Sequence, residues 1–185
     1  MFIQTEATPN PATLKFLPGQ PVMTSGVADI TTPEQAKASP LAGALFAIEG
    51  IKGVYLGADF ITLTKADDKE WLLLKPAVLG VIMDHFTSGR EVMTGSIDTG
   101  HAAGTGNEDD GEIIDQIIDL LDTRIRPAVA QDGGDITFLK YEKGVVYLSM
   151  RGACSGCPSS TATLKNGIEN MLRHYVPEVT EVRAG

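Results

Sequence analysis

Cysteine is scarce in this chain, which has two cysteines among 185 residues and is therefore not a disulfide-stapled scaffold. The two residues, Cys154 and Cys157, lie three positions apart in a single motif. Random placement would rarely bring the only two thiols of a chain so close together, so we interpret the pair as a site. Such sparse use of cysteine fits a reducing compartment.

The chain also lacks the features of nucleic-acid-binding and membrane-spanning proteins. Its net charge is −9 and no long stretch is strongly basic, which disfavours nucleic-acid binding. The longest apolar stretch, residues 71–86, contains Lys75, Pro76 and Asp84 and is too short and too polar to span a bilayer. The first residues resemble neither a secretory signal nor a transit peptide. We therefore expect a cytoplasmic protein, or a mature form whose presequence has been removed, with neither nucleic acid nor membrane among its partners.

A stretch of glycine, small and acidic residues divides the chain into two halves. Residues 98–111 have no apolar period and are typical of a flexible linker. Each half combines short strand patterns with amphipathic helical patterns. We predict an α+β protein with two small α/β-sandwich-type domains, the first over residues 1–90 and the second over 111–185, joined by a flexible linker over 91–110.

Two prolines bear on where helices begin and end. Asp67 or Asp68 could start a helix in which apolar residues recur at helical spacing over 71–85. Pro76 fits this helix poorly unless it starts later, nearer Lys75, because proline is best tolerated in a first turn. In the second half, a strong apolar stripe over 113–125 predicts an amphipathic helix. Pro127 should kink this helix or end it early, although the chain could continue helically to Gln131.

The cysteine motif lies between a predicted strand at 145–150 and a predicted helix. The residues after Cys157 are Pro-Ser-Ser-Thr, which suit a helix start and place both thiols near a helix N-terminus. Backbone N–H groups and the helix dipole favour anions there, so we expect the pKa of Cys154 and Cys157 to be lowered from about 8.5. Gly152 and Gly156 leave room for the close approach of an inorganic group or a second chain.

Two thiolates are half of the ligand set that a protein metal centre usually needs, because tetrahedral zinc and iron–sulfur clusters take four protein ligands. A two-fold dimer would bring Cys154 and Cys157 of each subunit to one interface and match a [4Fe–4S] cluster. Such a centre should be easy to release, which suits a carrier better than an enzyme. The residues alone leave three hypotheses open: a shared iron–sulfur or iron site, a shared zinc that bridges a dimer, and a thiol–disulfide oxidoreductase. The last is disfavoured because the motif comes late and follows a β-hairpin.

Other polar residues carry weaker signals. Asp132 and Asp135 flank a Gly-Gly turn, and we interpret them as capping and turn residues rather than iron ligands. We interpret His85 and His174 as ordinary helix residues. The first half has no paired carboxylates, Ser/His/Asp set or phosphate-binding loop, so we do not expect an enzyme active site there.

Several motifs together resemble those of the Nfu and NifU-like family. The Arg-Pro pair at 126–127, Asp-Gly-Gly-Asp at 132–135 and Gly-Ala-Cys-Ser-Gly-Cys-Pro-Ser-Ser at 152–160 closely resemble the C-terminal NifU domain. The first half resembles the Nfu N-terminal domain at residues 8–11 (Thr-Pro-Asn-Pro), 15–16, 50–57 and 71–86. The resemblance covers nearly the whole chain outside the linker.

This resemblance implies a non-enzymatic iron–sulfur cluster scaffold or carrier. It implies that Cys154 and Cys157 hold a [4Fe–4S] cluster, with [2Fe–2S] as the alternative, shared between two chains that form a homodimer when the cluster is bound. The implied partners are apo iron–sulfur client proteins and an upstream cluster scaffold, with the first domain as a module for partner recognition or cluster shielding. The scaffold domain that begins NifU and the presequence of mitochondrial members are missing from this sequence. We therefore expect a bacterial cytoplasmic protein, or a mitochondrial matrix protein whose presequence has been removed.

Overall fold

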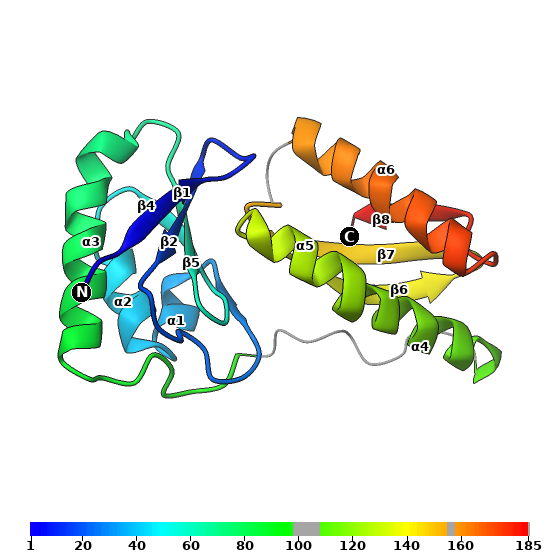
Figure 1. The fold of residues 1–185 in the computed structure, drawn as a ribbon, viewed down its shortest axis with the longest axis horizontal. Helices are drawn as coiled ribbons and strands as arrows, with labels where there is room; N and C mark the ends of the chain where they lie inside the picture. The colour runs from blue at the N-terminus through cyan, green and yellow to red at the C-terminus, as the bar shows by residue number, and fades with distance from the viewer. Residues whose placement is uncertain (98–107, 155–157, 185) are drawn as a thin grey trace. The chain divides into compact units, whose positions relative to one another are not determined.

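The computed structural model describes residues 1–97, 108–154 and 158–184. The chain divides into two compact units, Met1–Thr99 and Gly100–Gly185. Each unit combines helices with one sheet and has its own apolar core (Figure 1). The predicted α+β class with two small domains is therefore confirmed. No helix of the described residues is both long and apolar enough to cross a membrane.

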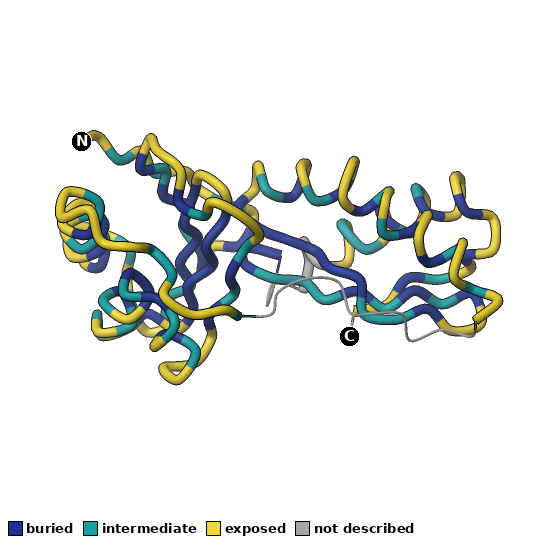
Figure 2. The backbone as a smooth tube through the Cα atoms, turned by 90° about the horizontal axis from the view of Figure 1, so that it is seen from below, coloured by how far each residue is buried: buried dark blue, intermediate teal, exposed yellow. Residues whose placement is uncertain are grey.

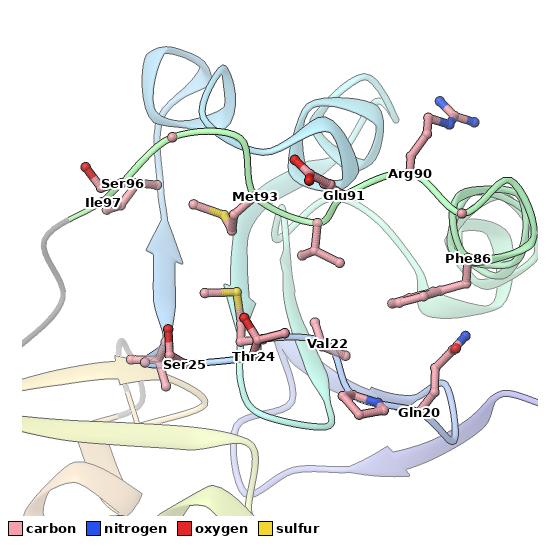
Figure 3. A pocket seen from close by; sticks show the side chains of 17 residues that line it. Gln20, Val22, Thr24, Ser25, Phe86, Arg90, Glu91, Met93, Ser96 and Ile97 are labelled. Carbon is pink, nitrogen blue, oxygen red and sulfur yellow. The ribbon is translucent and has the colours of Figure 1, made fainter.

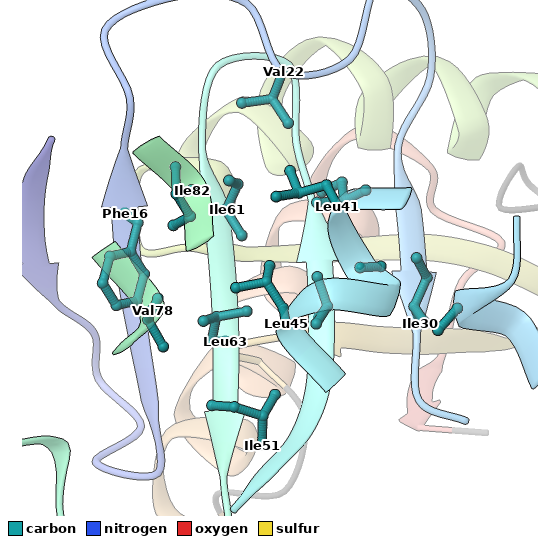
Figure 4. Close-up of a cluster of buried hydrophobic side chains, with 14 of the residues drawn as sticks. Phe16, Val22, Ile30, Leu41, Leu45, Ile51, Ile61, Leu63, Val78 and Ile82 are labelled. Atoms are coloured by element: carbon teal, nitrogen blue, oxygen red, sulfur yellow. The ribbon is translucent and has the colours of Figure 1, made fainter. Parts of the chain in front are cut away.

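The first unit is built on a five-stranded antiparallel sheet with the strand order β1-β2-β5-β4-β3. Its strands are β1 (Gln4–Ala7), β2 (Thr13–Leu17), β3 (Ala28–Ile30), β4 (Ile51–Leu56) and β5 (Ile61–Lys65). Its helices are α1 (Pro33–Ala36), α2 (Pro40–Phe46) and α3 (Trp71–Thr87). Helix side chains such as Leu45 and Val78 meet strand side chains such as Phe16 and Leu63 in the core (Figure 4).

Helix α3 begins at Trp71, so both expected starts, at Asp67 or Asp68 and nearer Lys75, are wrong. Pro76 lies inside the helix and has no N–H to donate to the carbonyl of Leu72, a loss that costs about 3 kcal/mol. Leu74, Val78 and Ile82 of the same helix are buried in the core, and each contributes about 1.5–3 kcal/mol. The helix tolerates Pro76 because this burial outweighs the missing hydrogen bond.

The second unit has a three-stranded sheet in which β6 (Gly134–Glu142) pairs antiparallel with β7 (Val145–Gly152), and β7 pairs parallel with β8 (Glu181–Ala184). A short 3₁₀ helix, η1 (Glu108–Asp110), precedes the helical elements α4 (Gly111–Leu120), η2 (Leu121–Ile125), α5 (Arg126–Gln131) and α6 (Pro158–Tyr175). Burial concentrates in the strands of both units, whereas exposed positions recur along the outer sides of the helices (Figure 2).

Pro127 does not end the helix that precedes it: of the two expected outcomes, an early end is wrong and helical continuation to Gln131 is confirmed. The backbone remains helical from Gly111 to Gln131, and a π-helical turn, η2, lies just before Pro127. A π turn shifts the hydrogen-bond register within a helix, so a residue that lacks a donor can follow it without breaking the helix. The local disturbance expected at Pro127 is therefore a π-helical turn within a continuous helix, not a break in the helix.

Candidate metal centre

Cys154 lies two residues after the last residue of β7, and α6 begins at Pro158. The structure therefore places the motif between a strand and a helix, as predicted. Cys157 falls within 155–157, outside the described residues, so the structure reports the surroundings of Cys154 alone.

The Asp-Gly-Gly-Asp turn at 132–135 lies directly beneath Cys154. Gly133 has a φ of +78°, a conformation that glycine adopts without strain, and its carbonyl accepts a hydrogen bond of 3.1 Å from the N–H of Ala153. A Cβ at Gly134 would collide with Cys154 Sγ and would lie 3.0 Å from the Cys154 backbone nitrogen. The backbone N–H of Asp135 donates a hydrogen bond to the Cys154 sulfur. The turn thus fixes the position of the sulfur in two ways. Gly134 has no side chain to occupy the space of the sulfur, and the backbone groups of Gly133 and Asp135 hydrogen-bond to Ala153 and Cys154.

The Asp135 carboxylate is held by Arg126 from the start of α5. The Nε and Nη2 atoms of Arg126 donate to Asp135 Oδ1 and Oδ2 at 2.9 and 3.0 Å, and Nη1 donates to Asp122 Oδ1 at 3.0 Å. The Asp135 side chain is only 4% exposed, so this two-pronged pair supplies the charge and hydrogen bonds that a buried carboxylate needs. Burial lowers the pKa of Arg126, but the bonds and charges of Asp135 and Asp122 raise it overall, so the guanidinium stays charged.

This ion pair was missed at the level of sequence. Asp135 was interpreted as a turn or capping residue, whereas its side chain binds Arg126 nine residues earlier in the chain. The available signal was that an Arg-Pro pair shortly precedes the Asp-Gly-Gly-Asp run, but spacing alone does not indicate which carboxylate the arginine binds. Asp132, at the end of α5, does have the capping position that was expected.

The Cys154 side chain is buried, and its thiol is less acidic than expected. Burial, and after it the negative charges of Asp135 and Asp132, raise the pKa of Cys154 to about 12, although the Asp135 N–H acts in the opposite direction. The expected lowering of this pKa is therefore wrong for Cys154. A thiol with such a pKa keeps its proton at neutral pH unless a metal displaces it.

Further metal ligands are missing around Cys154 in the part of the chain that the structure describes. No group of three or more His, Cys, Asp or Glu side chains in these residues is arranged to hold a metal ion. The Asp135 carboxylate nearby is already engaged by Arg126. The ligand shortage that the sequence indicates therefore persists in the described structure.

A separate cavity of about 670 Å³ lies in the first unit (Figure 3). It is formed by the loop 20–27 and by the segment that runs from Phe86 to Ile97. The charged residues among the described ones that line it are Arg90 and Glu91, and its apolar lining includes Met23 and Met93. The lining offers neither cysteine nor histidine, so we do not associate this cavity with metal binding.

Comparison with known proteins identifies two family models in the chain. Residues 3–89 match the family described as scaffold protein Nfu/NifU N terminal, and residues 117–183 match the NifU-like domain. A human protein named NFU1 iron-sulfur cluster scaffold homolog, mitochondrial, is 51% identical over 183 residues, which cover 98% of this chain and 71% of that protein. NifU-like protein 5, mitochondrial, from Arabidopsis thaliana is 52% identical over 184 residues, which cover 98% of this chain and 67% of that protein.

Among solved structures, a solution NMR structure of a NifU-like protein from Saccharomyces cerevisiae is similar to part of this chain. The match has 25% sequence identity and a TM-score of 0.47, and it covers 51% of this chain and 86% of that one.

Proposed function

Because this chain belongs to the family of Nfu and NifU-like scaffold proteins, we propose that it carries iron–sulfur clusters and transfers them to apo-proteins without catalysing a reaction of its own. Cys154 and Cys157 from each of two chains supply four thiolates, which is the ligand set of a [4Fe–4S] cluster, with [2Fe–2S] as the alternative. The observation that carries the proposal is the built surroundings of Cys154, whose sulfur is fixed by the Asp-Gly-Gly-Asp turn.

The residues around Cys154 act on the sulfur in two opposing ways. The Asp135 N–H donates to the sulfur and stabilises it when it carries negative charge, as outer hydrogen bonds do around metal-bound thiolates. Burial and the nearby carboxylates favour the protonated thiol. Uptake of the cluster must therefore displace a proton, and return of that proton favours release. Because the surroundings of Cys154 favour the protonated thiol over the bound cluster, the site is suited to releasing the cluster to another protein.

The remaining parts of the proposal concern partners and location. The first domain (1–90) recognises partners or shields the cluster, and the second domain (111–185) holds the cluster. An upstream scaffold supplies the cluster, and apo iron–sulfur proteins receive it. The names of the relatives place those proteins in mitochondria, which supports the mitochondrial matrix as one location for this chain, with the bacterial cytoplasm as the other.

The test is anaerobic purification and reconstitution with iron and sulfide, followed by measurement of iron, sulfide and zinc per chain and of the mass in solution. We expect about two irons and two sulfides per chain in a dimer, since four thiolates from two chains hold one four-iron cluster. The loaded protein should restore activity to an apo-enzyme that needs a [4Fe–4S] cluster.

Cys154→Ser and Cys157→Ser should each lose the visible absorbance, whereas Asn166→Ser, an exposed position on α6, serves as the matched control. Retention of full iron content in either cysteine variant would contradict the proposed ligand set. Zinc in place of iron and sulfide would favour a zinc-bridged dimer. A metal-free monomer with a cycling disulfide would favour the oxidoreductase, although burial and the raised pKa make Cys154 a poor nucleophile.

A further inference from the structure

His85, in the last turn of helix α3, is an ionisable side chain that is buried without a full set of partners. It is 2% exposed and lies on the buried side of the helix, together with Val78 and Ile82. Its imidazole hydrogen-bonds to the backbone of Arg90, whereas its Nε2 atom is buried and has no hydrogen-bond partner among the described residues. The bond therefore uses Nδ1, and the ring is the neutral tautomer with its lone pair on Nε2.

Protonation of this ring is costly where the ring lies. A proton on Nε2 would bury a second N–H without an acceptor, and it would bury a charge as well. The neighbouring helix α2 has no ionisable side chain, and the core cluster beneath α3 is apolar. Burial, and after it the charge of Arg90, therefore lower the pKa of His85 from its usual 6.5, although the bond to the Arg90 backbone and the charge of Asp84 act in the opposite direction.

The imidazole also helps to hold the turn that follows the helix. The Ser88 hydroxyl donates to the carbonyl of His85 at 2.8 Å and accepts from Arg90 Nε at 2.8 Å. The Arg90 guanidinium points away from the cavity of about 670 Å³ (Figure 3) and donates to Asp84 Oδ2 at 2.6 Å. Arg90 is thus fixed at its backbone by His85 and at its side chain by Asp84 and Ser88. The turn in turn starts the wall of the cavity that runs on to Ile97.

A hollow of about 330 Å³ lies beside His85, in the groove between α2 and α3. Small residues such as Ala44 and Gly80 line it, and a Cβ at Gly80 would meet no atom within 4 Å. Asp84 and Arg90 line the same hollow. It therefore offers the imidazole a second position, close to solvent and to a carboxylate.

We propose that His85 is a pH switch whose protonated ring rotates into this hollow and takes the Asp84 carboxylate from Arg90. In the closed state, the neutral ring holds the Arg90 backbone and Asp84 holds the guanidinium. In the open state, the imidazolium is hydrated and paired with Asp84, and Arg90 loses both contacts. The turn at 88–91 is then released, and with it one end of the cavity wall.

The direction of the pH dependence follows from the lowered pKa of the buried ring. The closed state is fully stable above pH 6.5, the usual pKa of the exposed ring, and it loses stability as the pH falls from 6.5 toward the lower pKa of the closed state. Acid therefore opens the turn, and neutral or alkaline pH closes it.

The test is nuclear magnetic resonance of the metal-free full-length chain from about pH 8 to about pH 5. The chain has three histidines, and the signal of the His85 ring is the one that is lost in His85→Gln. We expect this ring to titrate below 6.5. Hydrogen exchange of Arg90 Nε–H, relative to that of Arg183, should rise about two- to fivefold with the same midpoint, since an exposed ion pair protects to about this degree. Arg183 is the reference because it makes a comparable surface pair with Glu181.

Asp84→Asn tests the exchange of partners while the buried ring stays in place. This change should lower the pKa of His85 further and abolish the rise at Arg90, because the open state loses its carboxylate and Arg90 is already unpaired. Glu91→Gln is the matched control, since it removes a charge of the same sign from an exposed position in the same segment, and it should leave both readouts unchanged. A His85 ring that titrates at 6.5 or above overturns the proposal. An Arg90 exchange ratio that ignores pH in the parent, or that rises equally in His85→Gln, overturns it as well.

Discussion

The two units of this protein bury polar side chains for different purposes. In the first unit, Ser39 is 1% exposed, and its hydroxyl accepts from the N–H of Ala42 and donates to the carbonyl of Val92, so it joins a helix start to a distant segment. In the second unit, the buried Asp135 carboxylate binds Arg126, and its backbone N–H binds the Cys154 sulfur. The first arrangement holds a fold together, whereas the second also holds a reactive group in place. Substitutions in the two units should therefore separate stability from cluster binding.

The largest effect is expected from Arg126→Met, which leaves the buried Asp135 carboxylate without its partner. Breaking a buried ion pair from one side costs about 3–5 kcal/mol, and we expect about 3 kcal/mol here because Arg126 is partly exposed. Urea unfolding gives the loss of stability, and iron content after reconstitution should fall with it. Arg183→Met is the control, because Arg183 makes a comparable pair with Glu181 on the surface and its loss should change little. Equal effects of the two changes would contradict a special role for the buried pair.

Gly134→Ala should have the next largest effect, because the added methyl group collides with the Cys154 sulfur. Overpacking of this kind costs about 1–3 kcal/mol, and we expect iron content to fall further than stability does because the displaced atom is the proposed ligand. Gly167→Ala on α6 is the matched control, since a Cβ there meets nothing and alanine favours the helix. A Gly134→Ala chain that loads as much iron as the parent would show that the sulfur position is not fixed by this turn.

Ser39→Ala should have a smaller effect and one confined to stability. Loss of a helix cap costs about 0.5–2 kcal/mol, and the Val92 carbonyl loses its donor as well. Thermal unfolding should report the change, whereas iron content and cluster transfer should equal those of the parent. A drop in cluster loading in this variant would contradict the proposal that the first unit affects stability without affecting cluster binding.

The smallest effect at neutral pH is expected from the ionisation of Cys154. Because the folded pKa of this thiol is raised to about 12, its contribution to stability is fully present below the ordinary thiol pKa near 9 and is lost as the pH rises toward 12. Urea unfolding of the metal-free Cys157→Ser chain between pH 7 and 11 should therefore show a steeper decline than that of the chain lacking both cysteines. Alkylation of the single thiol should likewise be slow at pH 7 in the folded chain and fast in urea. Parallel pH profiles of the two chains would contradict the raised pKa.

Much of the fold could be predicted because it follows from local patterns. Apolar spacing indicated the long helices, and turn residues separated the strands. The start of α3 was predicted wrongly because a local rule about Pro76 was outweighed by tertiary burial of the same helix.

The candidate site was predictable in position but not in its electrostatics. Residue types and order placed Cys154 between a strand and a helix, yet its burial and raised pKa depend on the turn at 132–135, which contacts it only in the folded unit. The ion pair between Arg126 and Asp135 could not be predicted from the sequence for the same reason, since the two side chains meet only after α5 and β6 have formed. Cys157 lies outside the described residues, so the full ligand set stays a prediction.

The π-helical turn η2 keeps the buried residues before and after it on the same side of the helix. Ile117, Leu121, Ile125 and Val129 are all buried, yet they are spaced by four residues each, and in a regular α-helix every such step drifts by about 40° around the axis. Three steps would accumulate about 120° and turn Val129 toward solvent, and the wider turn between them takes up that drift. Deleting one residue from η2 would rotate all that follows by about 100° and move Arg126 away from Asp135. The pairing of Arg126 with Asp135 near the Cys154 thiol therefore depends on a π-helical turn that lies well before Cys154 in the chain.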